Sequence, residues 1–270
     1  MSPRVRVIRG VVDSRFLSGY IMDFSGLSII FFTSIIGASF GTLVGGTSLL
    51  TIPVLIFLGL PPHTAIGTDR LGIAGLTTVG WYKFHQKGLI NYPISLWMGL
   101  AAVVGSFLGA SLVFEISMGL LRKIIAIATV GILVIVIAQP GLGLGEKGRM
   151  IQGRTYGTGI FITFLIGVYG GFYGAMAGTF LLYVLLFVFD QTFLEGTATL
   201  KLTSLMMTTM AAVIFAGKGA VDYPMAAAMF LGCAIGSYIG AHYSDRIGNV
   251  WIKRLFILIV LIMVVKLLIP

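Results

Sequence analysis

The feature that most constrains this chain is a set of short motifs that recurs in its second half at a constant interval. KGLINYP at 87–93 returns as KGAVDYP at 218–224, and GSFLGA at 105–110 returns as GSYIGA at 236–241. The interval is the same for both pairs of motifs, so the chain consists of two halves with the same order of elements. Any fold must therefore accommodate each element twice.

The composition indicates that these halves fold in a lipid bilayer. The sequence is 57% hydrophobic and 10% charged, and its mean hydropathy is +1.03. Such values are typical of integral membrane proteins and exclude a soluble domain. The net charge is +9, but the basic residues gather in the N-terminal tail and in short loops. We therefore expect a multi-pass protein of the cell membrane, with lipid headgroups and not nucleic acid as its charged partner.

The sequence shows no pattern for a resident metal, a cofactor or an enzymatic nucleophile. Cys233 is the single cysteine, which excludes a disulfide within the chain. His63, His85 and His242 lack the spacing of metal ligands. Neither a Walker loop nor a GxSxG motif occurs. We therefore expect no cofactor, and we expect the protein not to be an enzyme.

Ten apolar segments follow the repeat, five in each half. They are 25–44, 48–60, 64–82, 92–114 and 120–139, then 157–176, 179–189, 196–216, 224–244 and 250–269. Because about 20 helical residues are needed to cross the hydrocarbon core, the second segment of each half is too short. We expect it to form the second limb of a re-entrant or broken-helix hairpin. Each half then has one hairpin and three crossings, an odd number, which inverts the second half relative to the first.

These segments define the expected domain organisation. A basic tail occupies residues 1–24, the first transmembrane repeat 25–139 and the second transmembrane repeat 157–270. The stretch 140–156 is rich in glycine and charge, which predicts a linker. The predicted fold class is therefore an all-α integral membrane protein made of two inverted repeats.

Glycine and hydroxyl residues stand where each short limb is expected to begin. Gly45, Gly46 and Thr47 precede the first limb, and Gly178 and Thr179 fall at the expected second break. Glycine adopts backbone conformations that interrupt a helix. A helix that starts at membrane depth directs N–H groups and the positive end of its dipole into the protein, which suits an anion. The alternative is that these glycines only permit tight helix packing.

The interval between the motifs also pairs two cations inside apolar segments, Arg70 and Lys201, and two threonines, Thr68 and Thr199. A charge in hydrocarbon costs several kcal/mol unless it faces a partner, water or a ligand. We expect Asp69 to be unable to neutralise Arg70, because adjacent helical residues point about 100° apart. The cations are thus predicted to attract an anion, with the threonines as hydrogen-bond donors. The alternative is that the cations reach the interface or form a structural ion pair.

The remaining glycine pattern is interpreted as structural. Gly105 and Gly109 are spaced by four residues, and so are Gly232, Gly236 and Gly240. Such spacing places small residues on one helix face and lets two helices approach closely. We therefore expect these glycines to form packing surfaces.

At these residues the chain resembles the TauE/SafE family of sulfite exporter-like membrane transporters. The similar stretches are GGTSLLTIP at 45–53, PPHTAIGTDRL at 61–71, and the KG and GSxxGA motifs in both halves. The resemblance covers about residues 26–269, but Thr47 and Ser48 stand where many members carry more glycine. It implies secondary transport, with export as the expected direction, of small sulfur-containing anions such as sulfite or organosulfonates.

The functional hypothesis is therefore a secondary transporter that holds a small anion near the midplane, between the two breaks and the paired cations. A coupling proton or another ion is the expected second partner. A passive anion channel built from the same cations and a membrane scaffold without transport remain the alternatives. The pair of buried cations favours transport, because a scaffold has no use for them.

Overall fold

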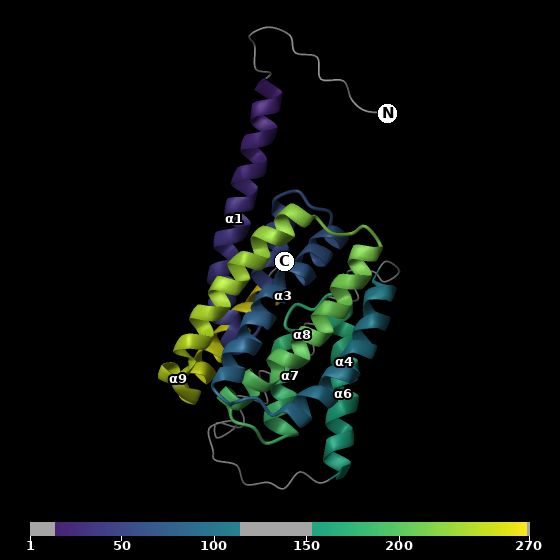
Figure 1. Cartoon of the computed structure of the whole chain (residues 1–270), viewed down its shortest axis with the longest axis vertical. Helices are drawn as coiled ribbons and strands as arrows, with labels where there is room; N and C mark the ends of the chain where they lie inside the picture. The colour runs from purple at the N-terminus through teal and green to yellow at the C-terminus, as the bar shows by residue number, and fades with distance from the viewer. Residues whose placement is uncertain (1–13, 114–152, 269–270) are drawn as a thin grey trace.

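The computed structural model describes residues 14–113 and 153–268, and all regular secondary structure in these ranges is α-helical (Figure 1). The first half contains α1 (Ser14–Val44), α2 (Ser48–Phe57), α3 (Pro62–Gln86) and α4 (Tyr92–Leu112). The second half contains α6 (Gly153–Phe172), α7 (Ala177–Phe187), α8 (Phe193–Gly217) and α9 (Tyr223–Leu268). Among the described residues, four helical stretches are long and apolar enough to span a membrane, namely Ser25–Val44, Tyr92–Leu112, Phe193–Gly217 and Tyr223–Ser244. The expected all-α membrane architecture is confirmed at this level.

The helices keep the spacing of the sequence motifs. α3 and α8 each contain 25 residues, and their starts are separated by the same interval as the paired motifs. The same interval separates the starts of α4 and α9, at Tyr92 and Tyr223. Equivalent side chains cap the N-termini of α4 and α9. Asn91 accepts a hydrogen bond from the backbone N–H of Ile94, and Asp222 accepts one from the backbone N–H of Met225. N-terminal capping thus fixes the same boundary in both halves.

The two halves pack closely together, because the first helix of each half packs against a helix of the other half. α1 packs along α9 and α6 packs along α4, while α3 also contacts α9 and α4 also contacts α8. At the centre, α3 and α8 run antiparallel. Gly67 near the start of α3 lies against Phe215 near the end of α8, and Gly80 near the end of α3 lies against Lys201 near the start of α8. Neither half could bury its own apolar surface in this arrangement.

The spaced glycines are confirmed as packing surfaces. A Cβ atom on Gly109 of α4 would lie 1.9 Å from the carbonyl oxygen of Val168 on α6. A Cβ atom on Gly240, the equivalent residue of α9, would lie 2.4 Å from the carbonyl oxygen of Ser39 on α1. Gly105, Gly232 and Gly236 make equally close approaches. The contacts of α4 with α6 and of α9 with α1 therefore depend on residues without a side chain.

The helix bounds differ from the expected segments in three places. α1 begins at Ser14, within the stretch expected to be a basic tail, and α6 begins at Gly153, within the expected linker. α9 is a single helix over the segments expected at 224–244 and 250–269. The segment 120–139 and most of the linker lie outside the described residues.

Candidate functional site

Each half contains a short helix that follows an interruption of the helical backbone, and both interruptions lie near the centre of the molecule. α2 has 10 residues and α7 has 11. The first interruption is where the sequence predicts it, because Gly45 and Gly46 adopt φ values of +80° and +84° between α1 and α2. Only glycine enters this region without a steric penalty.

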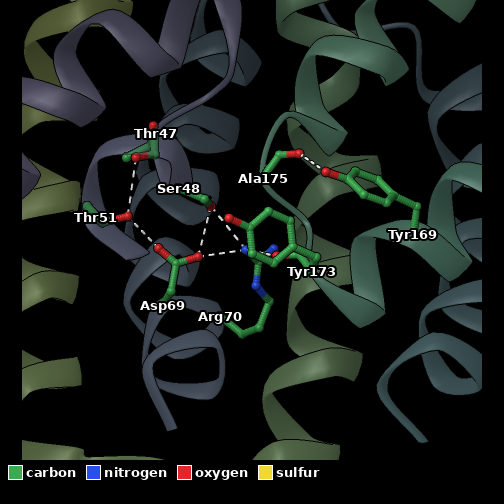
Figure 2. A network of polar contacts seen from close by, with 8 residues as sticks. All are labelled: Thr47, Ser48, Thr51, Asp69, Arg70, Tyr169, Tyr173 and Ala175. Carbon is green, nitrogen blue, oxygen red and sulfur yellow. Dashed lines mark hydrogen bonds and ion pairs between the residues drawn. The ribbon is translucent and has the colours of Figure 1, made fainter. Parts of the chain in front are cut away.

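The second interruption differs from the prediction. It spans residues 173–176, where Gly174 has φ +67° and Met176 has φ +68°. The expected break at Gly178 and Thr179 was wrong by a few residues, since both lie in the first turn of α7. Gly174 takes the left-handed conformation instead, and the hydroxyl group of Tyr169 on α6 donates to the carbonyl oxygen of Ala175 within the break (Figure 2).

A small cavity of about 50 Å³ lies where both interruptions meet α3 and α8. A volume of this size accommodates about three waters or one small ion. Most of its lining consists of repeat-related pairs: Gly45 with Met176, Gly46 with Ala177, Thr47 with Gly178, Arg70 with Lys201, Ile73 with Ser204, Leu76 with Met207, and Thr77 with Thr208. The cavity therefore lies on the interface between the two halves, and α2 and α7 both begin at its wall.

Arg70 reaches this cavity from α3 within a polar network (Figure 2). Its side chain is 2% exposed. Its Nη2 atom donates to Asp69 Oδ2 over 2.6 Å, to Ser48 Oγ over 3.0 Å and to the carbonyl oxygen of Tyr173 over 3.2 Å. The guanidinium group thus joins α2, α3 and the second interruption.

The expectation that Asp69 cannot pair with Arg70 was wrong. The two Cα–Cβ directions do diverge along a helix, but an arginine side chain is long enough for its guanidinium group to curve back to the neighbouring carboxylate. Asp69 is fully buried, and it also accepts hydrogen bonds from Thr51 over 2.5 Å and from Ser48 over 2.8 Å. Sequence reasoning missed this residue as part of the site, although its position beside Arg70 was the available signal.

Lys201 faces the same cavity from α8 in a different environment. Its side chain is 1% exposed, and within the described part of the chain no acceptor or carboxylate contacts its ammonium group. Leu200 precedes it, at the position that Asp69 holds in the first half. A buried ammonium group requires compensation by charge or hydrogen bonds. The cavity is the place from which that compensation can come.

Three predicted site residues lie outside the cavity wall. Thr68 Oγ1 accepts a hydrogen bond from the backbone N–H of Asp222 over 2.9 Å, and Thr199 Oγ1 accepts one from Asn91 over 3.1 Å. These two bonds are related by the repeat and attach α3 and α8 to the loops before α9 and α4. Thr179 Oγ1 donates to the carbonyl oxygen of Val44 over 2.9 Å and so connects the two interruptions. The role of these hydroxyl groups toward a substrate stays a prediction.

Replacing Gly174 by alanine is expected to lower transport at least about tenfold. A Cβ atom there would lie 2.0 Å from Arg70 Nη1, so the guanidinium group must move. Gly88→Ala is the matched control, because Gly88 has a similar φ of +66° and no atom within 4 Å of the added methyl group. Both variants carry about 1 to 2 kcal/mol of backbone strain. Initial transport rates and thermal stability, measured on both, separate strain from displacement of Arg70. Equal transport rates in the two variants would contradict the expected role of Arg70.

Comparisons with known proteins agree with this architecture. The chain is 27% identical over 244 residues to the probable membrane transporter protein YfcA of Escherichia coli (strain K12), covering 90% of this chain and 89% of that protein. It is 27% identical over 214 residues to the probable membrane transporter protein YdhB of Bacillus subtilis (strain 168), covering 77% of this chain and 86% of the relative. No solved structure matches it. Residues 29–267 match the family described as "Sulfite exporter TauE/SafE", and the chain therefore belongs to that family.

Proposed function

We propose that this protein is a multi-pass secondary transporter of the cell membrane that carries a small anion through the cavity between its two repeats. The observation that carries the proposal is the buried ammonium group of Lys201, which faces the cavity with no acceptor in the described residues. An anion bound there would supply the missing compensation. Arg70 and the N-terminal turns of α2 and α7 provide further donors around the same space.

The charge balance of the site favours an anion of low charge. When Lys201 is protonated, Arg70 and Lys201 contribute two positive charges, and Asp69 offsets one of them. One net positive charge therefore remains near a cavity of about 50 Å³. Singly protonated sulfite meets both conditions, short organosulfonates carry the same single charge, and the family description names sulfite export. We propose these anions as the substrate class and export as the direction.

The proposed mechanism is alternating access by two inverted repeats. Inverted repeats can exchange conformations, and this exchange opens a shared central site first to one side and then to the other. The antiparallel packing of α3 against α8 supports the inversion, since these helices are equivalent elements of the two repeats. The short helices α2 and α7 would form the second limbs of the two broken-helix hairpins.

Transport by purified protein in proteoliposomes tests the proposal. A panel of sulfite, sulfonates, sulfate and carboxylates is offered with and without unlabelled anion on the opposite side. A carrier is expected to show counterflow, in which the opposing anion accelerates exchange of the labelled one. Flux without such acceleration would indicate a passive channel, and absence of flux for the whole panel would contradict the proposed function.

A further inference from the structure

The carboxylate of Asp69 lies just behind the wall of the cavity. Asp69 itself does not line the cavity, but two of its partners do, Ser48 and Arg70. Ser48 Oγ donates to Asp69 Oδ2 and accepts from Arg70 Nη2, so the three groups form a closed triangle (Figure 2). An anion that draws the Nη2 atom of Arg70 into the cavity would therefore take it away from Asp69.

Among the described residues, Arg70 is the one countercharge that acts on Asp69. On its own helix it faces Arg70, and on α2 it faces the neutral hydroxyl groups of Ser48 and Thr51. Among the described side chains of α9, the thiol group of Cys233 lies within electrostatic reach of Asp69. If the guanidinium group turns toward an anion, a fully buried carboxylate is left with hydroxyl donors alone, and a buried charge without its partner is costly.

We propose that Asp69 is the site of the coupling proton, which it takes up when an anion draws Arg70 into the cavity. This inference rests on the proposed function. In this step the carboxylate accepts one proton from the aqueous phase on the open side, and no other bond is made or broken. The neutral carboxyl group then keeps its hydrogen bonds with Ser48 and Thr51. One proton accompanies each anion, and the two move in the same direction, so export requires an outward gradient of the anion or of protons, and the same coupling runs inward when the external side is acidified.

The geometry favours a proton over a metal cation at this position. Before an anion binds, Asp69 Oδ2 lies 2.6 Å from the arginine Nη2 atom, so a sodium ion at that oxygen would meet a positive charge at contact distance. Membrane-embedded carboxylates in transporters commonly serve as proton relays. By linkage, the anion must bind more tightly at lower pH by the same factor by which it favours protonation of Asp69.

The test compares two transport modes in proteoliposomes with a pH indicator inside. The wild-type protein is expected to accumulate its anion against a concentration gradient when the external side is acidified, and the lumen is expected to acidify with it. Asp69→Asn is expected to lose acid-driven accumulation and lumenal acidification at least about tenfold more than it loses counterflow of the anion. Asp222→Asn is the matched control, because Asp222 caps α9 away from the cavity and asparagine preserves a cap acceptor. This control is expected to retain both modes.

Three results overturn the inference. They are acid-driven accumulation that persists in Asp69→Asn, net anion accumulation by the wild-type protein without acidification of the lumen, and loss of both modes in the Asp222→Asn control. Absence of counterflow in the wild-type protein would instead overturn the proposed function on which the inference depends. If Asp69→Asn does not fold, Thr51→Val replaces it, since this variant keeps the carboxylate and removes one donor to it. Its pH midpoint for accumulation is expected to move upward, and an unchanged midpoint would overturn the inference.

Discussion

Replacement of Lys201 by methionine is expected to lower anion counterflow about 100-fold without lowering the thermal stability of the protein. Loss of a buried charge that pairs with a ligand costs about 2 to 5 kcal/mol, and each 1.4 kcal/mol corresponds to about tenfold in affinity. Methionine fills a similar volume with a flexible apolar chain. Because Lys201 has no protein partner in the described residues, its removal strands no carboxylate. Counterflow rates and thermal unfolding in detergent measure the two effects.

The control for this experiment is Lys218→Met. Lys218 is exposed just after α8, so its replacement removes the same charge far from the cavity. We expect it to keep counterflow within about twofold of the wild-type rate. A Lys201→Met protein that transports normally would show that the lysine does not hold the anion. A protein that loses stability instead would indicate a structural role for Lys201.

Replacement of Gly45 by alanine is expected to destabilise the protein by about 2 to 5 kcal/mol. A non-glycine residue at φ +80° costs about 1 to 2 kcal/mol. The added Cβ atom would also lie 2.7 Å from the backbone nitrogen and Oγ1 of Thr179, and such overpacking costs about 1 to 3 kcal/mol. The methyl group would force the two interruptions apart. Thermal unfolding of the purified variant is expected to shift to a clearly lower midpoint.

Gly178→Ala is the matched comparison on the opposite side of the same contact. A Cβ atom on Gly178 would lie 3.7 Å from Gly45 Cα, which is an ordinary van der Waals distance. Alanine is also the better helix former by about 1 kcal/mol. We therefore expect the stability of this variant to equal or slightly exceed that of the wild-type protein. Equal destabilisation by both substitutions would mean that the interruptions do not meet as the structure shows.

The sequence predicts the order and spacing of the helices well because each helix start in one half must agree with the equivalent start in the other half. The interval between the paired motifs reappears between the starts of α3 and α8 and between those of α4 and α9. The packing glycines are predictable for the same reason, since helices approach closely only where side chains are small. Gly45 and Gly46 could be identified because few other residues permit their backbone conformation.

The remaining features depend on tertiary contacts that spacing along one chain does not encode. The second interruption falls at Gly174 and not at Gly178, because several glycines precede α7 and packing against Tyr169 and Arg70 selects among them. The pairing of Arg70 with Asp69 depends on how a long side chain bends within a cavity. Because of this pairing, replacing the two cations is expected to have different effects on stability. Removing Arg70 would leave a buried carboxylate without its partner, and removing Lys201 would not.

The most direct test of the central claim is the stabilisation of the purified protein by the anion that it transports. A ligand that binds only the folded state raises stability by RT ln(1 + [L]/Kd). We predict that this anion, at saturating concentration, raises the thermal unfolding midpoint of the wild-type protein and of Lys218→Met, and leaves that of Lys201→Met unchanged. An equal rise in all three proteins would show that the anion binds outside the cavity between the repeats and would contradict the account.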